Sequence, residues 1–237
     1  MFSSILGKKL DKFHLLKHPF YQVYWNEGKL TREIIKDYAE QYYQHVKAFP
    51  RYISATHSIC EDIEKRRILL ENLQDEENKD GDHPKLWKNF AKALGADEKE
   101  IEKVKLDWFT KDMIDNFFSQ ARKSYAEGLA SLYTYERQIP EIAETKIQGL
   151  KKFYGVSSKE GLEFFALRIR VDVSPGALEK ANAFPGCLVG LLGRDVNQAL
   201  VDVSLVAFLD RELMDLVILG IGQSTLDSQG CFEPLDL

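Results

Sequence analysis

Residues 31–49 read Thr31-Arg-Glu-Ile-Ile-Lys-Asp-Tyr-Ala-Glu-Gln-Tyr-Tyr-Gln-His-Val-Lys-Ala-Phe49, and their pattern runs through the first two thirds of the chain. Apolar side chains recur three and four residues apart with Lys and Glu between them, which is the spacing of amphipathic helices. Thr31 provides a polar N-cap, and Pro50 marks a kink or a junction. No alternating strand pattern is sustained. The sequence therefore predicts an all-α bundle.

Three further helical stretches follow the first one. The periodicity predicts helices over about 51–78, over 86–94 with Gly95 closing it, and over about 111–153. Because Pro140 falls inside the last stretch, we expect this helix to bend there rather than stop. The 237 residues contain no obvious linker, so they predict one domain over 1–237.

The C-terminal part, residues 166–237, differs in composition from the rest. It holds 5 Lys+Arg against 10 Asp+Glu, whereas residues 1–165 hold 27 of each. It is also rich in glycine and proline, and two broken helices, within about 193–219, are the most that its pattern predicts. Such a shift fits a second module, a diverged terminus or a reading-frame change, of which we favour divergence.

Charge and cysteine usage exclude several classes of protein. The net charge of -5 and the absence of a basic stripe argue against a nucleic-acid partner. The three cysteines have no zinc-type spacing and are an odd number, which favours a reducing compartment and hence the cytoplasm; they are Cys60, Cys187 and Cys231. The start lacks a signal-like apolar region, and the apolar run 213–222 is short and carries Asp215, so no membrane span is expected.

Glu136 lies on an apolar helical stripe. The stripe has spacings of four, three, four and three residues, and its other members are Tyr125, Leu129, Leu132 and Ile139. A carboxylate on this stripe faces the bundle interior, where it needs a cation, a hydrogen-bond donor or a proton. A metal ion satisfies that need, and so does a structural pair with Arg, Lys or a tyrosine hydroxyl.

Glu76 and His83 form a second candidate pair. Glu76 shares a helix face with Leu69 and Leu73, and His83 follows seven residues later, which is nearly two turns if the helix continues through Gly81. Helical bundles build dinuclear iron or manganese sites from such carboxylates and imidazoles. The alternative is a solvated helix end in a charged run.

Several blocks of sequence resemble one known family. These blocks are residues 42–52, 73–78 with 83–87, and 132–140. In order and spacing they resemble the chlamydial protein associating with death domains (CADD) and its bacterial relatives, over roughly 10–172. The resemblance implies a haem-oxygenase-like bundle of about seven helices, shared with the pyrroloquinoline quinone synthase and TenA/thiaminase families. It also implies a non-haem dinuclear metal oxidase that uses iron and/or manganese with dioxygen. In that family one of the protein's own tyrosines supplies p-aminobenzoate for folate biosynthesis.

The family's metal ligands are only partly present. The positions that match are Glu76, His83, Glu136 and Asp172. The third family motif, a histidine, an aspartate four residues on and a histidine three residues further, reads Arg168-Ile-Arg-Val-Asp172-Val-Ser-Pro175 here. Arginine is a permanent cation and proline offers no side-chain donor, so neither replaces an imidazole. Arg168 would repel a second cation, or would neutralise Glu136 or Asp172 in a structural ion network.

The resemblance also implies catalytic residues. Tyr21 aligns best with the sacrificed tyrosine, although Tyr24 stays open, and Lys146 matches the amino donor. Lys146 follows Glu136 by ten residues, close to three helical turns, so on one long helix it shares roughly the same face. Tyr38 is expected near the site. The alternative is that the tyrosines are core aromatics and Lys146 a surface lysine.

Three functions are therefore weighed. The first is the metal-dependent oxidase that forms p-aminobenzoate. The second is a metal-impaired member that acts as an interaction protein, with a death-domain protein as partner by resemblance. The third, thiaminase-type hydrolysis, ranks low because it needs a nucleophilic cysteine near 133–136, where the chain has none. The sequence leaves the oligomeric state open, and a homodimer through exposed apolar faces, which is common among such bundles, is one alternative.

Overall fold

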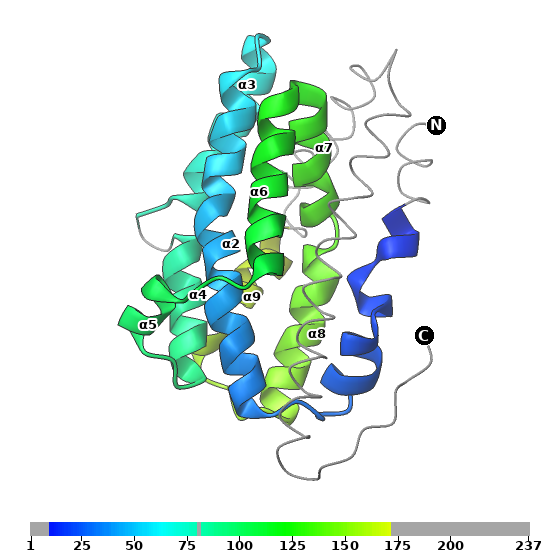
Figure 1. Cartoon of the computed structure of the whole chain (residues 1–237), viewed down its shortest axis with the longest axis vertical. Helices are drawn as coiled ribbons and strands as arrows, with labels where there is room; N and C mark the ends of the chain where they lie inside the picture. Colours follow the sequence, from blue (N-terminus) through cyan, green and yellow to red (C-terminus); the bar gives the residue numbers. More distant parts are fainter. Residues whose placement is uncertain (1–9, 80–81, 172–237) are drawn as a thin grey trace.

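The computed structural model describes residues 10–79 and 82–171, which form a helical bundle (Figure 1). These residues contain eight α-helices and no strand, which confirms the all-α prediction, with one helix more than expected. The predicted tail helices within 193–219 lie outside the described residues, so the single-domain assignment of 1–237 stays a prediction.

The elements follow one another with short connections. Two 3-10 turns and a π-helix come first: η1 (Asp11–Phe13), η2 (Leu15–Lys17) and η3 (Phe20–Trp25). The α-helices are α2 (Arg32–Ser58), α3 (Ile63–Glu76), α4 (His83–Ala93), α5 (Glu98–Lys103), α6 (Trp108–Lys123), α7 (Tyr125–Glu136), α8 (Ile139–Lys152) and α9 (Lys159–Val171).

Helix α2 is the centre of the bundle. It packs against α3, α4, α5, α6 and α7, while α9 packs against α4 and α8 (Figure 1). One face of α2 is buried along its whole length, because its apolar residues recur with the helical period; they include Ile35, Tyr38, Tyr42, Val46, Phe49 and Ile53. Among the described residues, no helix combines the length and the apolar character needed to cross a bilayer.

Two predictions of helix ends were wrong: a predicted junction lies inside one continuous helix, and a predicted continuous helix is broken. Helix α2 runs through Pro50 to Ser58, so this proline is no junction, and the next helix begins only at Ile63. The predicted helix over 111–153 is instead three helices, α6, α7 and α8. Ser124 caps α7 by accepting a hydrogen bond from the Glu127 amide at 3.3 Å, and Pro140 lies in the first turn of α8.

The predicted helix over 51–78 also ends earlier than its last residue. Helix α3 stops at Glu76, and Asp82 starts α4 by accepting a hydrogen bond from the Lys85 amide at 2.6 Å. Gly95 closes α4 with a φ of 95°, as predicted, because glycine adopts this conformation without steric cost.

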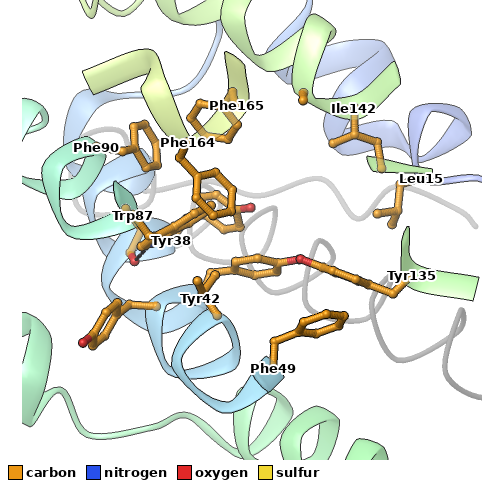
Figure 2. Packing of buried hydrophobic residues seen from close by; sticks show 14 of the residues in the cluster. Leu15, Tyr38, Tyr42, Phe49, Trp87, Phe90, Tyr135, Ile142, Phe164 and Phe165 are labelled. Atoms are coloured by element: carbon orange, nitrogen blue, oxygen red, sulfur yellow. Dashed lines mark hydrogen bonds between the residues drawn. The ribbon is translucent and has the colours of Figure 1, made fainter. Parts of the chain in front are cut away.

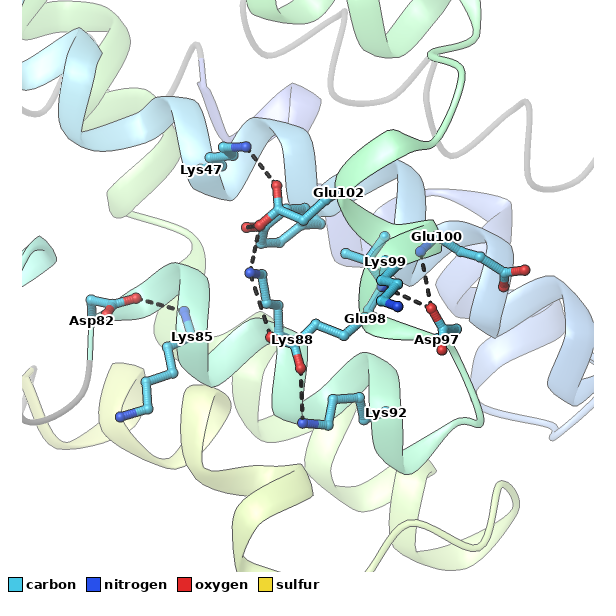
Figure 3. Close-up of polar contacts among 12 residues, drawn as sticks. Lys47, Asp82, Lys85, Lys88, Lys92, Asp97, Glu98, Lys99, Glu100 and Glu102 are labelled. Carbon is cyan, nitrogen blue, oxygen red and sulfur yellow. Dashed lines mark hydrogen bonds and ion pairs between the residues drawn. The ribbon is translucent and has the colours of Figure 1, made fainter.

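An ion network on the outside of the bundle connects helices α2, α4 and α5 (Figure 3). The Glu102 carboxylate pairs with Lys47 at 2.6 Å and Lys88 at 2.5 Å, and it accepts a hydrogen bond from the Tyr43 hydroxyl at 2.7 Å. This network ties the short helix α5 to the central helix.

Candidate functional site

A buried arginine joins two of the predicted metal ligands. Arg168 on α9 places Nη2 3.1 Å from Oε1 of Glu76, and its Nη1 lies 2.9 Å from Oε1 and 3.2 Å from Oε2 of Glu136. The other oxygen of Glu76 contacts Nδ1 of His83. The side chains of Arg168 and Glu76 are 7% and 3% exposed, whereas that of Glu136 is 32% exposed.

These side chains converge because three helix ends meet beside α9. Glu76 is the last residue of α3, His83 the first of α4, and Glu136 the last of α7. The predicted convergence of Glu76 and His83 is present, but its predicted cause was wrong. The two residues meet across a break between helices and not along two turns of one helix.

The charged side chains of this cluster shift one another's pKa values. Burial alone would raise the pKa of Glu76, but the Arg168 cation and the contact with His83 outweigh it and lower this pKa. Burial raises the pKa of Glu136, because Arg168 offsets only part of the lost hydration. Burial would lower the pKa of Arg168, yet the two carboxylates raise it further, so the guanidinium stays charged. Glu76 and Arg168 therefore form a fixed ion pair.

The arrangement does not fit a pair of metal ions. Among residues 10–79 and 82–171, no three His, Cys, Asp or Glu side chains are grouped so that they could hold an ion. The guanidinium lies between the carboxylates that would have to bridge the metals. Positions 172 and 175, where the family motif continues, lie outside the described residues.

A small cavity adjoins the ion cluster. Aromatic rings form much of its wall, and Figure 2 shows several of them; its lining residues are Leu15, Tyr21, Tyr38, Tyr42, Trp87, Tyr135, Ile139, Ile142, Ala143, Lys146, Phe164, Phe165 and Arg168. It offers about 20 Å³ to the centre of a water-sized molecule. This volume holds about one water molecule, so a free aromatic substrate does not fit unless the wall opens further.

Lys146 and Tyr38 meet in this cavity. The Lys146 ammonium, on α8, donates a hydrogen bond to the Tyr38 hydroxyl on α2. It also lies 4.7 Å from the centroid of the Tyr38 ring and 5.4 Å from that of Tyr42. Lys146 is 5% exposed, so it is not a surface lysine. The idea that one long helix aligns it with Glu136 was wrong, because α7 and α8 are separate helices.

Of the two candidate tyrosines near the N-terminus, Tyr21 lies at the cavity. Tyr21 on η3 is fully buried, and its ring packs edge-on against Phe20 with centroids 4.9 Å apart. Tyr24 is partly buried and is not one of the described residues that line the cavity. Cys60, the one described cysteine, is not part of the lining either.

Two features of the site were missed from the sequence. The hydroxyls of Tyr42 and Tyr135 are 3.1 Å apart, which joins α2 to α7 beside the ion cluster. His45 is completely buried under the rings around it. The spacing of Tyr38, Tyr42 and His45 by four and three residues places all three on one face of α2 and could have revealed both.

Comparisons with known proteins agree with this architecture. Residues 6–168 match the TENA/THI-4/PQQC family. The 4-aminobenzoate synthase of Chlamydia muridarum is 41% identical over 204 residues, covering 86% of this chain and 84% of the relative. The 4-aminobenzoate synthase of Nitrosomonas europaea is 42% identical over 182 residues, covering 73% and 74%.

Among solved structures, a domain of unknown function from Shewanella denitrificans superposes with a TM-score of 0.75. The alignment covers 99% of this chain and 97% of that domain at 13% identity, and its fold is described as haem oxygenase-like. The predicted haem-oxygenase-like fold is therefore confirmed. Because the family match spans well over half of the 237 residues, the chain belongs to the TENA/THI-4/PQQC family.

Proposed function

We propose that this protein forms p-aminobenzoate, taking the aromatic ring from its own Tyr21 and the amino nitrogen from Lys146. Relatives that are 41% and 42% identical bear the name 4-aminobenzoate synthase. The cavity supports the internal origin of both groups, because a phenol and an amine line a space too small for a free aromatic substrate. That small volume is the observation that carries the proposal.

Each residue has a role that its position supports. Tyr21 lines the cavity, and Tyr38 holds the Lys146 amine by accepting its hydrogen bond. The surrounding rings exclude bulk water from the amine. Dioxygen, which the resemblance implies as a co-substrate, is the proposed oxidant.

Iron and manganese are the metals that the resemblance implies. The residues that would hold them are Glu76, His83 and Glu136, together with Asp172. Because Arg168 lies between the two glutamates, this set does not fit two ions as it stands, and we derive no step through a metal.

Isotope labelling tests the proposal. The whole chain is produced in cells fed tyrosine with a heavy-carbon ring or lysine with heavy nitrogen at Nζ, then incubated with dioxygen, a reductant and ferrous and manganous salts. We expect both labels in p-aminobenzoate and loss of the Tyr21 side chain by peptide mass spectrometry. Unlabelled product would refute the internal origin.

Matched variants identify the donors. Tyr21→Phe should abolish the product, whereas Tyr24→Phe, in the same π-helix, should not. Lys146→Arg should abolish it, whereas Lys151→Arg, an exposed lysine on the same helix, should not. Product from Tyr21→Phe would contradict the assignment of that tyrosine.

A second candidate function is favoured by the Arg168 ion cluster. Because Arg168 pairs with the two glutamates that would bind a metal, the chain would be a metal-impaired member. It would act by binding a protein partner, which the resemblance suggests is a death-domain protein. Absence of p-aminobenzoate from the unlabelled wild type under the same conditions, together with binding of a purified death domain, would favour this function over the first.

A further inference from the structure

We infer that Arg168 is a built-in cation that takes the place of a metal ion between Glu76 and Glu136, so that this centre is complete without a divalent metal. Two carboxylates at the ends of different helices need a countercharge if they are brought together in a protein interior. The guanidinium supplies it from α9, and the Arg168 side chain is only 7% exposed.

The contacts of the carboxylate oxygens show how fully the Arg168 guanidinium takes the place of a metal ion. Oε1 of Glu76 faces Nη2 of Arg168 at 3.1 Å, and Oε2 faces Nδ1 of His83. Both oxygens of Glu136 face Nη1 of Arg168, at 2.9 and 3.2 Å. All four carboxylate oxygens therefore already have a partner. A planar guanidinium can bridge two carboxylates in this way because its nitrogens point in different directions.

A divalent ion would have to displace this side chain. The guanidinium and the ion compete for the same oxygens, and each repels the other in a poorly hydrated interior. Arg168 is held in place by the chain, so it is always present at the site, whereas the ion must come from solution. The wild-type chain should therefore not take up a stoichiometric metal ion at Glu76, His83 and Glu136.

Removing the Arg168 side chain should allow a divalent ion to bind at the two carboxylates. In Arg168→Ala the two carboxylates lose their cation, so the metal-free variant should melt several degrees below the wild type. Added Mn²⁺ should then restore the lost thermal stability, because a ligand that binds only the folded state stabilises it.

The experiment uses the full-length chain after treatment with a chelator. Thermal unfolding is followed with and without Mn²⁺, and the metal retained after desalting is measured by elemental analysis. We expect no shift and no stoichiometric Mn²⁺ for the wild type, but a shift of several degrees and about one retained ion for Arg168→Ala. Arg67→Ala is the matched control, because Arg67 pairs with Glu64 on the exposed surface of α3. It should change neither measurement.

Two further variants keep the test decisive if Arg168→Ala does not fold. Arg168→Met keeps much of the side-chain length but removes the charge, so it should be less stable than the wild type and gain stability from Mn²⁺. Glu136→Gln keeps the Arg168–Glu76 pair and should show no Mn²⁺ response. Stoichiometric Mn²⁺ in the wild type, or no Mn²⁺ response in any folded Arg168 variant, would overturn the inference.

Discussion

His45 should make the stability of this protein fall sharply in mild acid. The imidazole is 0% exposed, and its ring centroid lies 5.0 Å from those of Phe117 and Tyr135. Neither ring nitrogen has a hydrogen-bond partner among the described residues. Burial and, to a smaller extent, the Arg168 cation lower the pKa of His45 to about 3, and Glu76 opposes them only in part. The folded protein therefore holds this imidazole neutral.

The size of the effect follows from the two protonation states. In the unfolded chain the pKa returns to 6.5, so between pH 6.5 and about 3 the unfolded state binds a proton that the folded state lacks. The contribution of the neutral His45 side chain to the free energy of unfolding is therefore fully present above pH 6.5 and is lost as the pH falls. At pH 5 the loss is roughly 2 kcal/mol, because each pKa unit corresponds to about 1.4 kcal/mol.

Urea denaturation of the wild type and His45→Phe at pH 7 and pH 5 measures this loss. We expect the wild type to lose roughly 2 kcal/mol more than the variant between the two pH values. Any change in packing that phenylalanine causes cancels, since each protein is compared with itself. His57→Gln, at a half-buried histidine on the same helix, should behave nearly as the wild type. Equal losses in the wild type and His45→Phe would show that His45 is not the group that titrates.

Two further substitutions test the packing of α8 and the outer ion network. Gly149→Ala should lower the free energy of unfolding in urea, because the new Cβ would lie 2.8 Å from Cε2 of Trp25; overpacking costs ~1–3 kcal/mol, whereas alanine gains at most ~1 kcal/mol in helix propensity. A more stable variant would contradict this. Hydrogen bonds from Lys47 and Lys88 lower the pKa of Glu102 from 4.5 to about 2, so this carboxylate stabilises the fold above pH 4.5 and less as the pH falls toward 2. Glu102→Gln should therefore show a shallower acid limb in pH-dependent denaturation, and an unchanged limb would argue against the network.

The helical nature of the chain could be predicted because its signal is local. Apolar spacing along α2 fixes which face is buried, whatever it packs against. The residues at which the helices begin and end depend on weaker effects than this apolar spacing. Pro50 removes one backbone hydrogen bond, yet it is buried and the helix continues past it to Ser58. The break before α7 was visible in principle, because Ser124-Tyr-Ala-Glu127 has the spacing of a capping box.

The site was harder to predict, because its contacts are distant in sequence. Arg168 is 32 residues from Glu136, and Lys146 is 108 residues from Tyr38. No spacing rule relates such pairs, so only the packing of whole helices decides them. The possibility that Arg168 neutralises Glu136 came from the family resemblance, which puts Arg168 at a ligand position, together with the opposite charges of the two side chains.

The cavity wall holds two cations that are stabilised in different ways. Glu76 and Glu136 neutralise Arg168, whereas Lys146 lies against aromatic rings and the Tyr38 hydroxyl. Loss of Arg168 alone would make this wall one charge more negative and would leave Glu76 and Glu136 without their cation. Only another cation in place of the guanidinium would neutralise these two carboxylates again. Substitution of Arg168 should therefore destabilise this wall unless a divalent metal enters at the same time.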